Sequence, residues 1–551
     1  MTQVHGGHLV VKSLEREGVT HLFTLCGGHI DKILDALKES PIRVIDVRHE
    51  QAAAMMAQGW SMATGKLGVC LVTAGPGLTN AITGVVDAMA SHIPMLVISG
   101  RSPRKENDLG ALQDIDQAAL MRSITKAAFI INDTHRIPEY VSSAFRWALS
   151  DRPGPVYLEI PVDVLGQKVE LDAVPFGATG QTVYRPAGDP RAVAEAAQLL
   201  AGAERPIIIG GGGLRWGNGG DALRSLVEKT KIPFILLNEG RGTVPDDHPL
   251  SLWDGGLMGL TVAAAQCDVA LVAGLRMTWL TMYGKMLPTA KVIRVDIAGC
   301  EIGKNLPHEV GIVGDAGLVL SAIGDRIGPC DHSAWAAQIR ESSVALMADE
   351  NGRKQGDDPP IHPVRLVADV YSVFGNEAVY ATDGGDITYF AQMHLRSGGP
   401  GRFLSNGGNL MGCLGSGIPF GIVGKLSHPD RDSVVVNGDG SFGLNAMEIE
   451  TAVRLNIPII IVVANDQAWG MVKHGQELQY GRVVGADLGP VRYDLMAAGL
   501  GAHGEFVTEP KEIIPALKRA KDSGKVAVVN VITDPTITSP ATHLFVAGLN
   551  A

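Results

Sequence analysis

The sequence predicts an α/β protein of three consecutive domains, each with a parallel sheet covered by helices. Apolar runs of strand length alternate with segments of helical periodicity along the 551 residues, and this alternation is typical of parallel sheets buried on both faces. Two polar stretches rich in Gly, Pro or Asp interrupt it, at 176–190 and 349–363. The length also fits about three domains of roughly 150 residues each. We therefore expect domains at 1–178, 188–345 and 360–551.

In the first domain we expect strands at 21–25, 43–47, 68–73, 94–99 and 156–160. The second run is followed by Arg48-His49-Glu50 and a small-residue helical pattern. Glu50 therefore falls at the carboxyl end of a strand, where open α/β sheets bind ligands, although an acid is also favourable there simply because a helix begins. The third run leads into the Gly-rich turn Thr73-Ala74-Gly75, where the backbone can approach a ligand closely.

The middle domain should contain strands at 206–209, 233–237, 269–273 and 291–295. Four glycines, Gly210 to Gly213, follow the first of these runs and superficially resemble a dinucleotide-binding fingerprint. The match is weak, because Trp216 stands where the third glycine of that fingerprint belongs and no acid lies at the ribose-binding distance. We expect a tight strand-to-loop turn here.

The last domain carries the most informative pair of motifs. Strands are expected at 378–380, 433–436, 457–463 and 525–532, with a helix over 445–456. The run at 433–436 ends in Gly438-Asp439-Gly440-Ser441, and the next run ends in Asn465-Asp466. A strand-helix-strand crossover brings both acids to one sheet edge, and the glycine turn leaves N–H groups for phosphate oxygens. The pattern predicts a binding site for a metal-bound diphosphate.

This pairing resembles the signature of thiamine diphosphate enzymes, in which an Asn downstream of Gly-Asp-Gly ligates magnesium. Asp466 stands at the position of that Asn, whereas Asn465 keeps the preceding one. The resemblance implies the pyruvate decarboxylase-like architecture of that family and thiamine diphosphate with Mg²⁺ as cofactors. It also implies Asp439, Asp466 and the carbonyl of Ala468 as metal ligands, a set that suits a hard cation.

Within the resemblance, Glu50 is the carboxylic acid beside N1′ of the pyrimidine ring, needed for the ring to take a proton from the reactive thiazolium carbon. Leu414, in the segment 406–417, stands where the family has the bulky residue that bends the cofactor, and the carbonyl of Gly412 would accept from the 4′-amino group. The other residues that the resemblance assigns to the cofactor are Thr73, Gly75, Asn80, Gly385, Asp386, Gly438, Gly440, Ser441 and Met471.

Three stretches resemble benzaldehyde lyases in particular: 27–31 with Gly28-His29, 111–117 with Gln113, and 464–470. This implies a carbon-carbon lyase and carboligase that cleaves or forms 2-hydroxy ketones from aldehydes. His29 would move the hydroxyl proton near neutral pH, and Gln113 would orient a water or the alkoxide. The residues expected to line the substrate pocket are Gly28, Val162, Tyr389 and Met471, of which Val162 and Met471 depart from benzaldehyde lyases.

Three alternatives stay open. A 2-hydroxyacyl-CoA lyase or an oxalyl-CoA decarboxylase would use Arg276 against a nucleotide phosphate. An acetolactate synthase-like 2-oxoacid decarboxylase or ligase is the second alternative, although its flavin-associated pattern is absent at 274–279, so no FAD is expected. The third is a cofactor-binding subunit without turnover, which the presence of Glu50, His29 and Gln113 disfavours.

The composition limits the expected partners and the expected location of the protein. The formal net charge is -11 with Lys and Arg scattered, which argues against nucleic acid and membrane partners. Six cysteines without a CxxC spacing indicate neither zinc nor disulfides. With no signal peptide and no apolar run of about 20 residues, a cytoplasmic protein is expected. The resemblance implies a small-molecule aldehyde, 2-hydroxy ketone or acyl-CoA substrate and a homodimer at minimum, with homotetramers common in the family.

Overall fold

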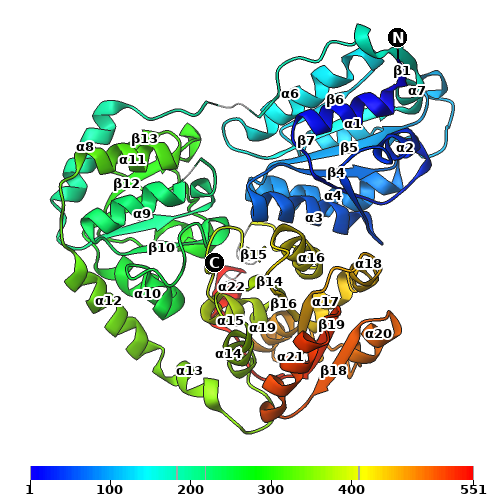
Figure 1. The fold of residues 1–551 in the computed structure, drawn as a ribbon. Helices are drawn as coiled ribbons and strands as arrows, with labels where there is room; N and C mark the ends of the chain where they lie inside the picture. Colours follow the sequence, from blue (N-terminus) through cyan, green and yellow to red (C-terminus); the bar gives the residue numbers. More distant parts are fainter. Residues whose placement is uncertain (1, 182–183, 218, 407–409, 550–551) are drawn as a thin grey trace. The chain divides into compact units, whose positions relative to one another are not determined.

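The computed structural model describes residues 2–181, 184–217, 219–406 and 410–549 (Figure 1). The chain divides into two compact units, Met1–Tyr184 and Arg185–Ala551. The first unit holds one parallel six-stranded sheet, and the second holds parallel sheets of five and six strands. Helices flank all three sheets, which confirms the predicted fold class. The three domain boundaries stay a prediction.

The sheet of the first unit has the strand order β3-β2-β4-β5-β7-β6. Its strands are β2 (His21–Thr24), β3 (Arg43–Asp46), β4 (Gly68–Val72), β5 (Met95–Arg101), β6 (Ala127–Ile130) and β7 (Pro155–Pro161). The helices are α1 (Gly6–Arg16), α2 (Asp31–Leu37), α3 (Glu50–Thr64), α4 (Pro76–Ser91), α5 (Gln117–Arg122), α6 (Ile137–Leu149) and α7 (Val162–Gly166). A separate antiparallel pair joins β1 (Gln3–His5) to β8 (Lys168–Glu170).

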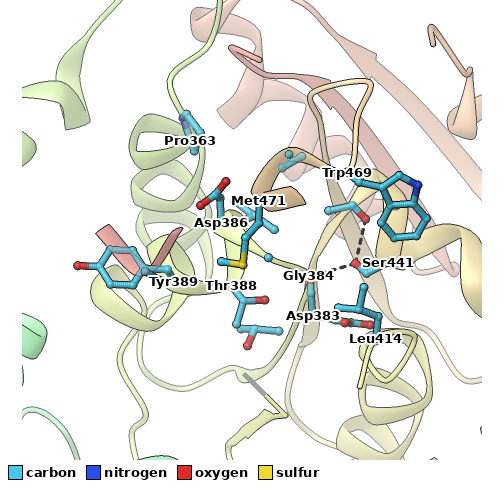
Figure 2. A pocket seen from close by; sticks show the side chains of 18 of the residues that line it. Pro363, Asp383, Gly384, Asp386, Thr388, Tyr389, Leu414, Ser441, Trp469 and Met471 are labelled. Carbon is cyan, nitrogen blue, oxygen red and sulfur yellow. Dashed lines mark hydrogen bonds between the residues drawn. The ribbon is translucent and has the colours of Figure 1, made fainter. Parts of the chain in front are cut away.

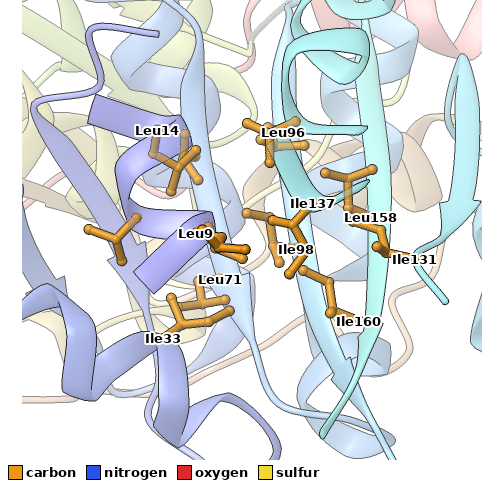
Figure 3. Packing of buried hydrophobic residues seen from close by; sticks show 14 of the residues in the cluster. Leu9, Leu14, Ile33, Leu71, Leu96, Ile98, Ile131, Ile137, Leu158 and Ile160 are labelled. Atoms are coloured by element: carbon orange, nitrogen blue, oxygen red, sulfur yellow. The ribbon is translucent and has the colours of Figure 1, made fainter. Parts of the chain in front are cut away.

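Helix α1 shows how this unit buries its core. Leu9 and Leu14 are both fully buried, on the broad apolar side of this helix. Figure 3 shows them in one cluster with Leu71 of β4 and Ile98 of β5. This packing buries one face of the sheet, and loops lie at its carboxyl edge.

The middle sheet of the second unit has the order β10-β9-β11-β12-β13. Its strands are β9 (Pro206–Gly210), β10 (Phe234–Leu236), β11 (Val269–Ala273), β12 (Lys291–Asp296) and β13 (Val310–Val313). Around them lie α8 (Pro190–Ala201), α9 (Gly219–Thr230), α10 (Gly256–Gln266), α11 (Ala316–Arg326) and α12 (Ser333–Leu346).

The glycine run after β9 is a tight turn packed against another turn. The backbone N–H of Gly213 donates to the carbonyl of Gly274 at 3.0 Å. A Cβ added at Gly213 would lie 2.7 Å from the Cα of Gly274. The glycines therefore let two backbone segments touch, which agrees with the tight turn expected after this strand.

The last sheet has the order β15-β14-β16-β17-β19-β18. Its strands are β14 (Val379–Asp383), β15 (Phe403–Ser405), β16 (Ser433–Gly438), β17 (Ile460–Asn465), β18 (His503–Val507) and β19 (Ala527–Ile532). The helices are α13 (Ala348–Gly352), α14 (Pro363–Phe374), α15 (Asp386–His394), α16 (Gly417–Ser427), α17 (Asp439–Leu444), α18 (Glu448–Arg454), α19 (Gly470–Tyr480), α20 (Tyr493–Gly499), α21 (Ile513–Asp522) and α22 (Pro540–Leu549).

Two expectations about this region need correction. The helix expected over 445–456 is the shorter α18, because a separate helix, α17, already begins at Asp439 and ends just before it. The stretch 349–363, expected to be a linker, begins inside the short helix α13. None of the helices in the described part of the chain is long and apolar enough to cross a membrane.

A buried arginine joins the two sheets of the second unit. Arg241, which follows β10, pairs with Asp246 at 3.0 Å and donates to the carbonyls of Gln392 and Leu395 at 2.8 and 2.6 Å. Its guanidinium lies 3.9 Å from the ring centroids of Trp253 and of Phe403. Because both acceptor carbonyls belong to the last domain, this side chain ties that domain to the middle one.

We predict that Arg241→Met lowers the free energy of unfolding by about 3–5 kcal/mol, because the substitution leaves Asp246 as a buried, unpaired charge. Urea denaturation measures the loss. Arg136→Met is the matched control, since Arg136 pairs with Glu139 at 2.8 Å on the surface and its removal should change stability little. Equal losses in the two variants would contradict the prediction.

Candidate functional site

A pocket of about 400 Å³ opens at the carboxyl edge of the last sheet. The strand order reverses between β14 and β16, so the loops after these strands diverge and leave a crevice. Figure 2 shows the loop after β14 beside Ser441 and Leu414. Of the residues predicted from the sequence, the pocket is lined by Gly385, Asp386, Tyr389, Gly412, Leu414, Gly438, Asp439, Gly440, Ser441, Asp466, Ala468 and Met471.

Glycine is required at two points of this wall. A Cβ at Gly440 would lie 2.6 Å from the indole of Trp469, and one at Gly385 would lie 2.7 Å from the Cβ of Met471. Ser441 fixes the turn from inside, because its hydroxyl donates to the carbonyls of Asp383 and Gly438 at 3.2 and 3.1 Å (Figure 2). The bare backbone at these turns suits a phosphate group.

Two carboxylates face each other at the ends of β16 and β17. Asp439 is 2% exposed, and its side chain lies within hydrogen-bonding reach of Asp466. One oxygen of Asp439 accepts from the N–H of Gly440 at 2.9 Å, and one of Asp466 accepts from the N–H of Ala468 at 3.2 Å. Burial raises the pKa of both carboxyls, and the Asp466 carboxylate raises that of Asp439 further.

These groups fit a divalent cation. The Oδ2 atom of Asp439 is buried, and in the described part of the chain no hydrogen-bond donor reaches it. No group of three or more His, Cys, Asp or Glu side chains suited to a metal occurs among the described residues. A cation here would therefore use Asp439, Asp466 and backbone or phosphate oxygens, which is how Mg²⁺ is commonly held.

The turn that carries Leu414 is tied down on both sides by residues that the sequence did not single out. Buried Asp383 accepts from the N–H groups of Gly415 and Gly417 at 2.8 and 2.9 Å. Asn445 donates to the carbonyl of Gly415 at 2.7 Å. Burial raises the pKa of Asp383 to about 6 despite these hydrogen bonds. Gly407 to Asn409, part of the same predicted motif, lie outside the described residues.

Asp386, expected to contact the cofactor, has its carboxylate engaged elsewhere. It pairs with His474 of α19 at 3.1 Å and accepts from the hydroxyls of Ser539 and Thr542. Burial opposes ionisation, but these hydrogen bonds outweigh it and lower the pKa of Asp386. Asp386 thus anchors the C-terminal segment at the pocket wall. Ser, Thr and His spread over distant segments give no sequence signal for such a cluster.

The outer part of the pocket is apolar. Leu257, Trp279 and Leu280 come from the middle domain, and Ile537 and Ala541 from the C-terminal segment. Tyr389 and Leu414 lie on opposite sides of the view in Figure 2, with Met471 between them. An apolar pocket beside a polar turn that can bind a phosphate is typical of a site for a cofactor and a small molecule.

The first unit holds a second cluster, at the carboxyl ends of β2, β3 and β4. Glu50 begins α3 and is buried, and its carboxylate accepts from the side-chain amide of Asn80 at 3.0 Å. His29 Nδ1 lies 3.4 Å from the hydroxyl of Thr73, across the point where the strand order reverses between β2 and β4. Four residues proposed from three motifs therefore meet in pairs.

Gln113 and Gly75 also touch. Gly75 has φ +61°, and a Cβ there would lie 2.8 Å from the Cβ of Gln113. Gly28 is exposed beside His29. Val162 begins α7 after β7, and β5 separates β7 from β4. Val162 therefore lies further along the sheet edge than the other expected substrate residues of this unit.

We predict that Asp466→Asn makes the metal-free protein more stable at neutral pH, by roughly 1–4 kcal/mol, because the Asp466 carboxylate raises the pKa of buried Asp439 and so lowers stability at pH values above the ordinary pKa of that group. The same change should shrink the stabilisation that Mg²⁺ gives, since the amide attracts a cation less. Thermal unfolding in EDTA and in Mg²⁺, without added cofactor, measures both effects.

Glu477→Gln, at an exposed acid of α19, is the charge-matched control. It should leave both the metal-free stability and the response to Mg²⁺ unchanged. An Asp466→Asn variant that is less stable than the parent protein in EDTA would show that the two carboxylates do not repel.

Three family models match the chain. The N-terminal TPP binding domain of thiamine pyrophosphate enzymes matches residues 4–120, the central domain 193–323, and the C-terminal TPP binding domain 383–531. Thiamine pyrophosphate is the same compound as thiamine diphosphate. The three matches follow the three sheets in order.

Curated relatives are similar over almost the whole chain. An acetolactate synthase large subunit of Mycobacterium tuberculosis is 35% identical over 546 residues, covering 98% of this chain and 97% of that protein. A 2-hydroxyacyl-CoA lyase of Arabidopsis thaliana is 33% identical over 556 residues, covering 97% and 96%. The large subunit of acetolactate synthase isozyme 2 of Escherichia coli is 31% identical, covering 96% of each. On these matches, the chain belongs to the thiamine pyrophosphate enzyme family.

Proposed function

We propose that this enzyme is a carbon-carbon lyase and carboligase that cleaves or forms a 2-hydroxy carbonyl compound, with an aldehyde as one partner. The observation that carries this proposal is the pairing of His29 with Thr73 at the point where the strand order reverses between β2 and β4. The Glu50–Asn80 pair joins the first residue of α3 to the N-terminal part of α4 in the same unit.

The imidazole suits the proton transfer that such a reaction needs. When a 2-hydroxy ketone is cleaved, its hydroxyl proton leaves as the carbinol carbon becomes an aldehyde, and ligation returns that proton. If Thr73 accepts from Nδ1 of His29, the Nε2 atom keeps a lone pair and can take the proton. Gln113 would hold the alkoxide or a water through its amide.

Bound thiamine diphosphate would supply a carbon centre that adds to carbonyl groups. We assign Asp439, Asp466 and Ala468 to its metal and the turn at Gly438, Gly440 and Ser441 to its diphosphate. Glu50 would protonate the pyrimidine ring, with Asn80 holding its carboxylate. Thr73 and Gly75 would lie beside the ring, and Gly412 and Leu414 would position it.

The alternatives differ in substrate. The acetolactate synthases among the relatives support a 2-oxoacid as the donor. The 2-hydroxyacyl-CoA lyase among the relatives supports an acyl-CoA as the substrate. Arg276 would then bind a phosphate of the CoA, and it lies three residues before Trp279, which lines the pocket. The apolar wall built by Leu257, Trp279 and Leu280 favours an uncharged acyl or aryl group over a small charged acid.

The proposal includes a homodimer as the minimum assembly. Glu50 and His29 belong to the first unit, whereas Asp439 and Asp466 belong to the second. Leu109 and Leu112, close in sequence to Gln113, are 75% and 77% exposed, and Leu410 and Met411 are 49% and 44% exposed just before Gly412. Apolar side chains that are exposed in this way on each unit are typical of an interface.

A substrate screen tests the reaction. The protein, loaded with thiamine diphosphate and Mg²⁺, is incubated separately with benzoin, acetoin, a 2-hydroxyacyl-CoA and pyruvate, and aldehyde and acetolactate are measured. We expect aldehyde release from a 2-hydroxy ketone or a 2-hydroxyacyl-CoA. Acetolactate formation alone would replace the proposal by the synthase alternative, and no turnover of any substrate would support a non-catalytic subunit.

We predict that Glu50→Gln slows exchange of the cofactor's C2 proton by about 100-fold or more, because an amide cannot supply the acidic proton. Cofactor affinity should stay within about threefold, since the diphosphate residues lie in the other unit. Proton NMR measures the exchange and calorimetry the affinity. Glu39→Gln, at an exposed acid of the same unit, is the control; near-normal exchange in Glu50→Gln would refute the assignment.

A further inference from the structure

Gln117 is a buried amide in the first unit to which no role has yet been assigned. It is the first residue of α5 and is 1% exposed. Its Oε1 atom accepts from the N–H of Gly75 at 2.8 Å. Its Nε2 atom donates to the carbonyl of Gly100 at 3.0 Å and lies 3.4 Å from the hydroxyl of Ser99. A buried amide with all these partners is held in one orientation.

The oxygen and the nitrogen of the Gln117 amide cannot exchange their hydrogen-bond partners. The N–H of Gly75 needs an acceptor and the carbonyl of Gly100 needs a donor, so a flipped amide would satisfy neither. The hydroxyls of Ser99 and Tyr157 are hydrogen-bonded at 2.5 Å. The Tyr157 hydroxyl also lies 3.2 Å from a carboxylate oxygen of buried Glu159. This polar chain keeps the Ser99 hydroxyl in place behind Gln117.

One end of the amide supports Gln113. The backbone of Gly75 lies against Gln113, as the 2.8 Å approach of a Cβ at Gly75 to the Cβ of Gln113 shows. Gln113 itself has a positive φ of 60°. A residue in this strained conformation stays there only if its surroundings hold it.

The other end supports His29. A Cβ at Gly100 would lie 2.3 Å from the carbonyl oxygen of His29 and 2.5 Å from its Cβ. The backbone of Gly100 is therefore packed directly against the histidine. Through two hydrogen bonds, Gln117 spans the backbone segments on which Gln113 and His29 rest.

We propose that Gln117 is a positioning residue that sets His29 and Gln113 relative to each other for proton transfer to and from the substrate. The inference rests on the proposed function. Glu50 is fixed separately, by the start of α3 and by Asn80, so its action on the cofactor should not depend on Gln117.

The test uses Gln117→Met, which keeps the side-chain length and removes both hydrogen bonds. We expect kcat for aldehyde release to fall roughly 10- to 100-fold, because small displacements of reacting groups cost about this much. KM and the exchange of the cofactor's C2 proton should stay within about threefold. Thr134→Val, which removes the buried hydrogen bond to Val164 at 2.8 Å elsewhere in this unit, is the control and should change none of these values.

Equal losses of aldehyde release and C2 exchange in Gln117→Met, or no loss of either, would overturn the proposal. If that variant does not fold, Gln117→Glu replaces it, because the carboxylate still accepts from Gly75 but has no proton for Gly100. The same expected and contradicting results then apply.

Hydrogen-deuterium exchange separates this inference from the proposed function. If the parent enzyme releases no aldehyde from any substrate, the proposed function fails, but the spanning role can still be measured. Amides in 27–30, 73–77 and 111–115 should exchange faster in the Gln117 variant than in Thr134→Val. Unchanged exchange in these segments would overturn the positioning role.

Discussion

The reversal of strand order within each parallel sheet is the constraint on which the sites of this protein depend. Where consecutive crossovers leave a strand in opposite directions, the loops above two neighbouring strands separate, and a crevice remains at the carboxyl edge. The reversal lies between β2 and β4 in the first unit and between β14 and β16 in the last sheet. Thr73 and Gly384 both follow strands at such a point. Local turn chemistry then decides what each crevice holds.

The middle sheet shows that the reversal alone does not make a site. Its strand order turns between β9 and β11, and glycines follow both strands, yet these glycines bring Gly213 and Gly274 into direct backbone contact. The space that a phosphate would need is filled by the chain itself. In the last sheet the glycine at 440 faces an indole and the pocket instead. The same residue type therefore closes one crevice and opens the other.

Much of the fold follows from the sequence because central strands of parallel sheets are continuous apolar runs. In the three parallel sheets the strands missed by that criterion are β6, β13, β15 and β18, each at the edge of its sheet, and the short antiparallel pair of β1 and β8 is missed as well. Edge strands are covered less completely, and β18 has only two apolar residues, Phe506 and Val507, so its hydrophobic signal is short. The motif residues Glu50, Asp439 and Asp466 could be predicted since Asp439 and Asp466 directly follow strands and Glu50 lies four residues after one. Gln117, Asp383 and His474 could not, because their partners lie far away in sequence.

Asp466 illustrates how a single departure from a family pattern changes the electrostatics of a site. An Asn there would face Asp439 with a neutral group, whereas Asp466 adds a charge beside a carboxylate that is already buried. In the metal-free protein the Asp466 carboxylate raises the pKa of Asp439, so that ionising both groups is unfavourable, and the backbone N–H groups of Gly440 and Ala468 offset this only in part. A bound cation would remove the repulsion and gain two attractions. A metal ion bound between these two acids would therefore gain affinity by relieving this unfavourable ionisation, which an Asn at the same position would not provide.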